Sequence, residues 1–276
     1  MQYTCAKMAA TPETRGISQQ NRVLLEQLHR AGPGPFDVAD ATSLWGMEHV
    51  AAGRRMRMLA ARGWLARSGP GLYLPVPLDA ARSGEWTEDP WLTVAKLFPD
   101  GYIGGWTACE HWGLTDQVFR ELFVFSPTRL SRDLEVGGTP VKVKLVRPGR
   151  LFGIRTAWRR SVRVRVSDPT RTLVDLLDDP SVGGGIRHVA DIVDSYLSGS
   201  HRDDDLLLEY SERLGNRTVF KRLGYLIETL GLTAPDLASA CRTRMSAGVT
   251  LLDPSQGTHG PIVSRWRLRI NADVSR

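Results

Sequence analysis

The sequence predicts a mixed α/β protein of the α+β kind, with an N-terminal winged helix-turn-helix followed by a larger domain that combines a basic-faced sheet with C-terminal helices. Three observations support this prediction. Three short helical patterns near the start lead into a glycine-tipped hairpin. Two central stretches alternate valine with lysine or arginine, as half-buried strands do. The last third returns to helical periodicity, and 276 residues are enough for two domains with their own cores.

Three helices are expected before the hairpin. The first begins at Ser18 and must end before the Gly-Pro-Gly-Pro run at residues 32–35, since proline removes a backbone donor and clashes with the preceding turn. Asp37 is suited to cap the second helix, over residues 38–45. The third covers residues 47–62 and is rich in arginine.

The third helix and the hairpin predict a DNA-binding element. Ala52, Met56 and Leu59 line the buried face of the helix, which leaves most of its remaining surface cationic or small. Small residues allow a helix to lie deep in a major groove, while arginines reach phosphates and guanine edges. The hairpin, over residues 63–74, is typical of a wing; the alternative is an ordinary solvated helix surface. The residues expected to contact DNA are Thr42, Ser43, Arg54, Arg55, Arg57, Arg62 and Arg67.

Composition along the chain predicts the domain boundaries. Residues 1–16 show no apolar period and are expected to be disordered. The DNA-binding domain is expected over residues 17–77 and a linker over residues 78–87, where proline, glycine and serine interrupt the pattern. The larger α+β domain is expected over residues 88–276.

The elements of the larger domain follow from periodicity and capping signals. Asp168 followed by Pro169 is a strong helix start, because the carboxylate caps the first turn and proline lacks only a donor that would be unpaired there. Helices are expected over residues 91–97, 170–177, 186–197, 204–214 and 218–230, with a short one ending near residue 112. Strands are expected over residues 122–125, 141–145, 162–166 and 266–270.

A basic belt lies in the middle of the chain. The whole chain has a net charge of +6. Residues 120–171 alone hold thirteen Lys/Arg against four Asp/Glu. If the strands at 141–145 and 162–166 are neighbours in one sheet, their four cations share a surface that would favour an anionic partner. Alternatively, acidic residues of the C-terminal helices neutralise this face. The basic belt is defined as Lys142, Lys144, Arg147, Arg150, Arg155, Arg159, Arg160, Arg163 and Arg165.

Several functional classes are disfavoured. Three scattered cysteines support neither a disulfide framework nor a zinc site, and no stretch has the length of a membrane span or the apolar core of a signal peptide, so a cytoplasmic protein without membrane partner is expected. Asp133, Glu135 and Lys142 are too loosely spaced for a metal-dependent nuclease. Cys109 and His111 point in different directions on a helix, so a catalytic pair of cysteine and histidine is not expected. The Gly-Gly-Gly run at 183–185 lacks the lysine of a phosphate loop and is interpreted as a turn. No enzyme activity and no cofactor are expected.

Four blocks of the sequence, in this order, resemble the AbiEi family of antitoxins from type IV toxin-antitoxin systems, which originated in abortive-infection phage defence. The blocks are residues 69–75 (GPGLYLP), 101–114 (GYIGGWTACEHWGL), 166–175 (VSDPTRTLVD) and 222–228 (RLGYLIE). The resemblance covers nearly the full length of the chain.

This resemblance implies two activities. The winged helix-turn-helix would repress the protein's own operon by binding inverted repeats in double-stranded operator DNA, through the arginines named above. The antitoxin domain, residues 88–276, would counteract a cognate nucleotidyltransferase-like toxin. The resemblance does not assign the residues for this second activity, so the basic belt is selected by its charge density alone. The alternative is a ligand-responsive winged-helix repressor without a toxin partner, which the identity of the adjacent gene would distinguish.

Overall fold

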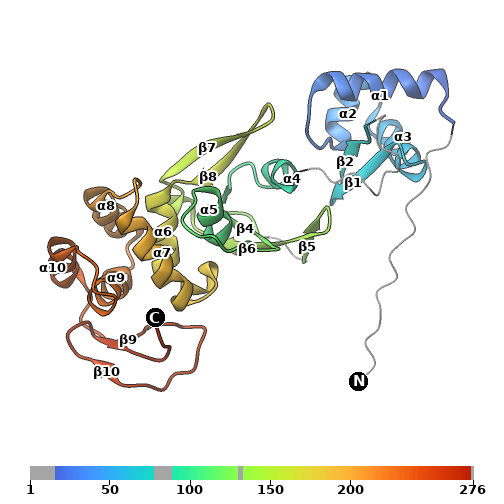
Figure 1. Ribbon diagram of the computed structural model, residues 1–276. Coiled ribbons are helices and arrows are strands. Elements are labelled where there is room, and N and C mark those ends of the chain that lie inside the picture. Colours follow the sequence, from blue (N-terminus) through green and yellow to red (C-terminus); the bar gives the residue numbers. More distant parts are fainter. Residues whose placement is uncertain (1–15, 78–88, 130–132, 275–276) are drawn as a thin grey trace, which may run out of the picture. The chain divides into compact units, whose positions relative to one another are not determined.

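The computed structural model describes residues 16–77, 89–129 and 133–274 (Figure 1). Within these ranges, helices and sheets occupy largely separate segments of the chain, so the protein is a mixed α/β structure of the α+β kind. The disorder predicted for residues 1–16, apart from Gly16, and the linker predicted for residues 78–87 lie outside the described residues. No described helix is both long and apolar enough to cross a membrane.

The chain forms two compact units, which are described separately. The first contains the described chain as far as Leu97, together with Leu134–Thr139 and Trp158–Val164. The second contains Phe98–Asp133, Pro140–Ala157 and the chain from Arg165 onward.

The first unit begins with three helices and a hairpin. They are α1 (Gln19–Ala31), α2 (Val38–Trp45), α3 (His49–Ala61), β1 (Leu65–Gly69) and β2 (Leu72–Pro75), with β1 and β2 antiparallel. The side chain of Ser18 accepts a hydrogen bond from the Asn21 amide at the start of α1, and Asp37 forms a capping box with Asp40 at the start of α2. The third helix begins two residues later than predicted, at His49.

A small apolar core holds these helices together. Leu28, Ala41, Ala52, Met56 and Leu59 are fully buried, so the face of α3 predicted to be apolar packs inward. The segment before α2 also pairs with the hairpin through an isolated antiparallel bridge between Phe36 and Tyr73. Helix α4 (Pro90–Leu97) belongs to the same unit, and the Lys96 Nζ lies 2.8 Å from an Asp40 carboxylate oxygen of α2.

A six-stranded sheet has the strand order β5-β6-β4-β3-β8-β7. Its strands are β3 (Tyr102–Ile103), β4 (Leu122–Ser126), β5 (Leu134–Val136), β6 (Thr139–Leu145), β7 (Ile154–Arg159) and β8 (Val162–Ser167). Strands β4 and β6 are parallel, as are β3 and β8, whereas β3 and β4 are antiparallel.

The two alternating strands of the sequence, β6 and β8, therefore lie in one sheet but are not neighbours. Strands β3 and β4 separate them, so their four cations do not form one continuous row. Burial explains this order: every residue of β3 and β4 is buried, and such strands belong in the interior of a sheet that is covered on both faces. The strands that carry cations on one face lie further out.

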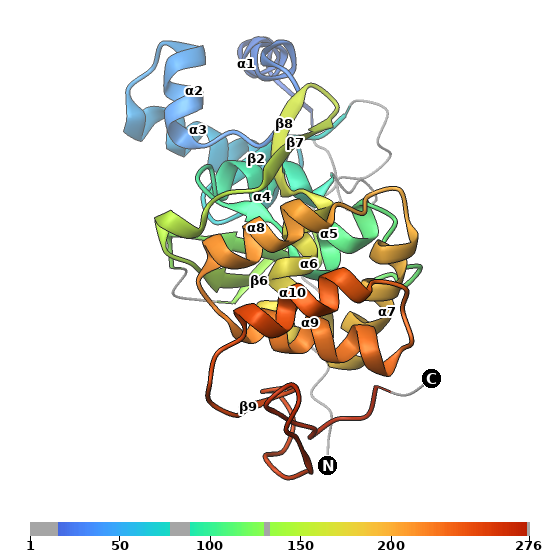
Figure 2. The ribbon, with the colours of Figure 1, turned by 90° about the vertical axis from the view of Figure 1, so that its left-hand side faces the viewer.

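The C-terminal part of the second unit is helical. It contains α6 (Pro169–Asp178), the short 3-10 helix η2 (Pro180–Gly183), α7 (Ile186–Ser198), α8 (Asp204–Leu214), α9 (Thr218–Thr229) and α10 (Pro235–Arg244), whereas α5 (Gly105–His111) lies earlier in the chain, between β3 and β4. Helix α6 contacts α5, α7, α8 and α9 and lies among them in Figure 2. The helices predicted at 170–177, 186–197, 204–214 and 218–230 are confirmed within one residue at each end, whereas α10 was not predicted.

A short three-stranded sheet closes the described chain, in the order β10-β11-β9. Its strands are β9 (Thr250–Leu251), β10 (Ile262–Val263) and β11 (Leu268–Arg269). The strand predicted over residues 266–270 is shorter than expected, because Arg267 adopts a left-handed backbone conformation with φ of 52° and turns the chain. Trp266, just before this turn, is fully buried and packs against Gly224 of α9.

Candidate functional site

Helix α3 exposes the two arginines on which the DNA-binding prediction depends. Arg54 and Arg57 lie on its solvent-exposed side, and Val50, seven residues before Arg57, leaves 65% of its surface exposed. Arg55 differs from them: it is only partly exposed and donates a 2.8 Å hydrogen bond to Oδ1 of the buried Asn21 in α1. The Arg55 side chain therefore also holds α3 against α1.

The other predicted DNA-contacting residues lie around this helix within the same unit. The hydroxyls of Thr42 and Ser43 donate to backbone carbonyls one turn earlier in α2, at 2.7 and 3.1 Å. Arg62 is exposed directly after the last residue of α3. Arg67 on β1 is exposed and holds its guanidinium carbon 5.8 Å from the centre of the Tyr73 ring.

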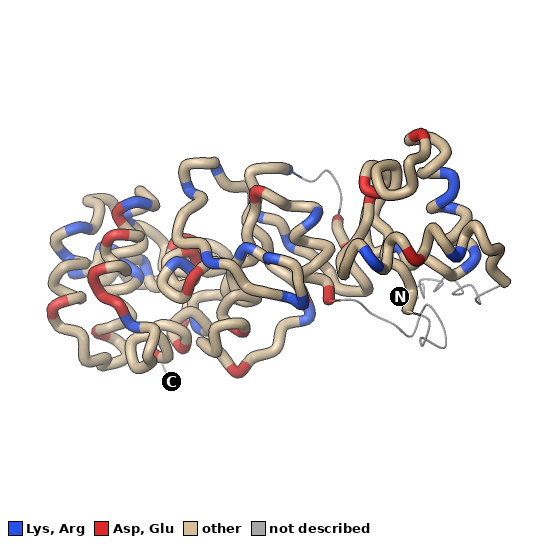
Figure 3. Tube along the Cα trace, turned by 90° about the horizontal axis from the view of Figure 1, so that it is seen from above, with Lys and Arg blue, Asp and Glu red and all other residues tan. Residues whose placement is uncertain are grey.

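The basic belt separates into two groups. Figure 3 marks the lysines and arginines of the described residues along the Cα trace. The first group lies near the C-terminal end of α6. Here the Lys144 Nζ lies 2.6 Å from Asp179 and the Arg150 guanidinium 3.3 Å from Asp178, whereas Arg147 is exposed. Lys142, on the same strand as Lys144, lies 3.7 Å from Glu121. Part of the belt is thus neutralised by carboxylates, as the alternative interpretation of the sequence proposed.

The second group lies on the hairpin formed by β7 and β8. This hairpin carries Arg155, Arg159, Arg160, Arg163 and Arg165 and has no acidic residue between positions 154 and 167. Trp158 leaves 63% of its surface exposed, and the Arg163 guanidinium carbon lies 5.8 Å from the centre of its ring. Arg159 stacks on Trp91 of α4 at 4.2 Å and lies 3.7 Å from Asp89.

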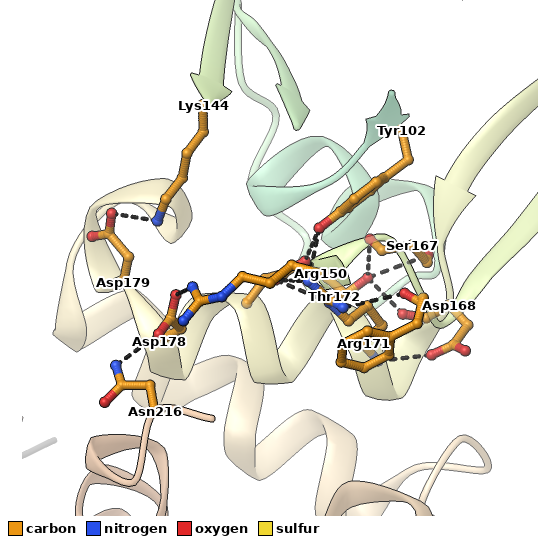
Figure 4. A network of polar contacts seen from close by, with 12 residues as sticks. Tyr102, Lys144, Arg150, Ser167, Asp168, Arg171, Thr172, Asp178, Asp179 and Asn216 are labelled. Atoms are coloured by element: carbon orange, nitrogen blue, oxygen red, sulfur yellow. Dashed lines mark hydrogen bonds and ion pairs between the residues drawn. The ribbon is translucent and has the colours of Figure 1, made fainter. Parts of the chain in front are cut away.

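A buried polar network centred on α6 was not identified from the sequence (Figure 4). Arg171 and Asp175 form an ion pair of 2.9 Å with side chains that are 1% and 3% exposed. Tyr102 of β3 donates to Asp175 at 2.9 Å and accepts from Arg171 at 3.0 Å, while Arg171 also donates to the Phe152 carbonyl at 3.2 Å. All polar atoms at this junction are therefore paired, as buried charge requires.

Burial and charge shift the pKa values in this network. Burial raises the pKa of the Asp175 carboxyl, and the neighbouring Arg171 opposes this without cancelling it. Burial also raises the pKa of Tyr102 well above its usual value, and the Asp175 charge adds to the shift. For Arg171, burial lowers the pKa, but its charge interactions and hydrogen bonds with Asp175 and Tyr102 together outweigh that effect, and the net shift of the pKa is upward.

Both ends of α6 are also closed by buried side chains. At the start, the carboxylate of Asp168 accepts from the Arg171 amide at 2.7 Å and from the Tyr210 hydroxyl at 3.1 Å. At the end, Arg222 of α9 donates to the carbonyls of Leu177 and Asp178 at 2.7 and 2.9 Å. Burial lowers the pKa of Arg222. The sequence block at residues 166–175 therefore builds the centre of the second unit.

A pocket of about 320 Å³ lies beside this network. Lys144, Arg147 and Arg150 of the basic belt all line it, and Arg171 with Asp175 contributes from the buried network. The structure thus gathers in one place residues that the sequence placed in a dispersed belt. The full lining is Phe125, Lys144, Leu145, Val146, Arg147, Arg150, Arg171, Asp175, Asp178 and Leu214.

The weaker candidate sites of the sequence have structural explanations. Cys109 is fully buried, and burial raises the pKa of its thiol, so it packs in the core and is not activated as a nucleophile. Residues 183–185 form the end of η2 and the turn before α7, as predicted, with Gly184 and Gly185 at positive φ. Within the described ranges, no three His, Cys, Asp or Glu side chains are grouped as a metal site would require.

The described residues form an α+β protein. Its similarity to a known protein is found by comparing structures and not by comparing sequences. No protein-family model matches the chain, and no curated protein does. A solved structure of the Rv2827c protein from Mycobacterium tuberculosis is similar, with a TM-score of 0.67 and 17% sequence identity over 94% of each chain. At this identity the likeness shows a shared fold over almost the whole length of both proteins.

Proposed function

We propose that this protein is an antitoxin of the AbiEi type, which represses its own operon through residues 17–77 and counteracts a nucleotidyltransferase-like toxin through residues 88–276. The observation that carries the proposal is the exposed cationic face of α3, which is followed directly by a short hairpin. The antitoxin part of the proposal rests on the four sequence blocks named above and on their order along the chain, which resemble the AbiEi family.

In this proposal, α1 to α3 with β1 and β2 act as a winged helix-turn-helix. Helix α3 is the recognition helix, and Arg54 and Arg57 reach base edges or phosphates because they extend from its exposed side. Arg62 and Arg67 are then expected to contact the phosphate backbone of the DNA. Arg55 supports the helix through Asn21.

The β7–β8 hairpin is the part of the basic belt best suited to a toxin or to its nucleic-acid target. It carries five arginines and no acidic residue of its own, and Arg159 pairs with Asp89 before α4, whereas Lys144 and Arg150 are paired with carboxylates at the end of α6. The exposed Trp158 adds an aromatic surface, and exposed aromatic and arginine side chains are enriched in interaction surfaces.

Binding to DNA from the region upstream of the gene tests the first activity. We expect the double variant Arg54→Ala/Arg57→Ala to lose specific binding in fluorescence anisotropy, and wild-type affinity to fall steeply with salt, because phosphate contacts release counterions. The double variant Arg22→Ala/Arg30→Ala is the matched control, since it removes two exposed arginines from α1. A salt-independent affinity, or equal loss in both double variants, would contradict the assignment.

Growth rescue tests the second activity. The proposal expects a nucleotidyltransferase gene next to this one, and cells expressing that gene should grow when this protein is co-expressed, including as the Arg54→Ala/Arg57→Ala variant. The double variant Arg160→Ala/Arg163→Ala on the hairpin should rescue poorly at equal protein level. If the wild-type protein gives no rescue, the antitoxin assignment fails regardless of DNA binding.

One observation favours a second candidate, a ligand-responsive repressor. The 320 Å³ pocket beside α6 could hold a small effector. An operon of metabolic genes in place of a neighbouring nucleotidyltransferase gene would favour this function.

A further inference from the structure

The pocket beside α6 combines cations from three consecutive parts of the chain. Lys144 lies on β6, Arg147 just after that strand, and Arg150 at the end of the 3-10 helix η1 (Pro148–Arg150). The tight turn of η1 brings Arg147 and Arg150 to the same opening, and the buried pair of Arg171 and Asp175 lines the pocket beside them.

The carboxylates near this pocket are already engaged, whereas the cations retain free donors. Asp175 accepts from Arg171 and Tyr102, and Asp178 accepts from Arg150 and from the Asn216 amide at 2.7 Å. Lysine offers three donors and arginine five. Lys144 and Arg150 each have one carboxylate partner, and Arg147 makes no ion pair within the part of the chain that the structure describes. The groups in the pocket that remain available for hydrogen bonds to a ligand are therefore mostly N–H donors of lysine and arginine.

Two further features suit an anion. The C-terminal end of a helix normally repels negative charge, but Arg222 binds the last carbonyls of α6 and offsets this effect. The lining also includes four cations against two carboxylates, and the balance stays positive by one charge when Asp179, the partner of Lys144, is counted with them.

We propose that this pocket binds a small phosphate-bearing molecule, whose phosphate oxygens accept hydrogen bonds from Arg147, Arg150 and Lys144. A phosphate group suits the site because it spreads its charge over several oxygens and can engage several cations at once, and arginine forks match its geometry. The apolar remainder of the ligand would lie against Phe125, Leu145 and Leu214. The volume of about 320 Å³ restricts the ligand to roughly the size of a nucleotide or smaller.

Ligand binding would compete with the ion pairs that now hold two of the cations. Arg150 is bound to Asp178, the last residue of α6, and Lys144 to Asp179, which joins α6 to η2. Engagement of these cations by phosphate would weaken their hold on this segment. The proposal does not depend on the antitoxin assignment, because it concerns only the purified protein and a small ligand.

Isothermal titration calorimetry on the full chain at low salt tests the proposal, with pyrophosphate, a nucleoside diphosphate and the corresponding nucleoside as probes. Pyrophosphate and the nucleoside diphosphate should bind, and the nucleoside should not. Tighter binding of the nucleoside diphosphate than of pyrophosphate would indicate that the apolar wall is used, whereas equal binding would assign the site to the phosphate group alone.

The variant Arg147→Ala should weaken binding by about tenfold or more, since a charge-assisted hydrogen bond is lost. Lys142→Ala is the matched control, because Lys142 lies on the same strand as Lys144 but outside the pocket. It should bind within about twofold of the wild type, as expected for an exposed charge outside the site. Absence of binding to the wild type at millimolar phosphate probes, no effect of Arg147→Ala, or an equal loss in both variants would overturn the proposal. None of these results bears on DNA binding or growth rescue.

Discussion

Arg171 and Asp175 lie one turn apart on α6 and form an ion pair of 2.9 Å in the interior of the second unit. The Tyr102 hydroxyl bridges the two side chains, so a strand of the sheet is tied to the central helix by a charged, fully hydrogen-bonded junction. Such a junction fixes the position of α6 because any displacement would leave a buried charge without its partner.

Breaking this pair should strongly destabilise the protein. We expect Asp175→Asn to lower the free energy of unfolding by about 3–5 kcal/mol, since the buried Arg171 charge loses its counterion. Urea unfolding monitored by circular dichroism measures this loss. Arg187→Ala, which removes an exposed ion pair with Asp273, should have a much smaller effect. Similar losses in the two variants would show that burial of the pair is not important for stability.

Gly224 on α9 should not tolerate a side chain. A methyl group there would overlap the ring of the fully buried Trp266, so Gly224→Ala should destabilise the protein by roughly 1–3 kcal/mol or more. Thermal unfolding provides the measurement. Gly149→Ala is the control, because its methyl group would meet no atom within 4 Å. If Gly224→Ala melts at the wild-type temperature, the direct packing of α9 on Trp266 is wrong.

The ion pair of Lys144 and Asp179 should make the free energy of unfolding depend on pH in the acidic range. Burial alone would raise the pKa of Asp179, but hydrogen bonds from Lys144 and Ser181, together with the charge of Lys144, outweigh it and the net shift is downward. A carboxyl with a lowered pKa stabilises the folded state above the usual value of 3.8, and this contribution is lost as the pH falls through the lower folded-state pKa. Unfolding of Asp179→Asn measured across this acidic range should lack that part of the pH dependence, whereas Asp205→Asn, an exposed change on α8, should retain it.

Arg54 and Arg55 should have separable roles although they are adjacent. Arg54→Ala should reduce DNA affinity with little change in stability, because its side chain is exposed. Arg55→Ala should lower stability by about 1–2 kcal/mol, because Asn21 loses a charged hydrogen-bond donor in a nearly buried position. Anisotropy and urea unfolding on both variants give the comparison. Equal effects of the two substitutions on stability would contradict the role assigned to Arg55.

Much of the secondary structure could be predicted because its signals are local. The Gly-Pro-Gly-Pro run ended α1, Asp37 capped α2, and Asp168 with Pro169 began α6, each through a backbone requirement within a few residues. The closing strand at 266–270 was overestimated because alternation of residues does not reveal a positive φ at Arg267.

The candidate sites were harder to predict. Charge density selected Lys144, Arg147 and Arg150 but did not reveal that they meet at one pocket, or that Asp178 and Asp179 neutralise two of them. A local signal for the buried network was present: Arg171 and Asp175 stand one turn apart in a helix that also carries the apolar residues Leu173, Val174, Leu176 and Leu177.

The sequence by itself determined the class of fold, the order of nearly all helices and the cationic character of α3, because periodicity, capping and charge are properties of neighbouring residues. Tertiary structure alone decided that β3 and β4 separate the two basic strands, that Arg55 turns toward Asn21, and that Tyr102 joins Arg171 and Asp175 from about seventy residues away. These relationships depend on which apolar surfaces are buried together, and burial is settled by the packing of the whole unit and not by any single segment.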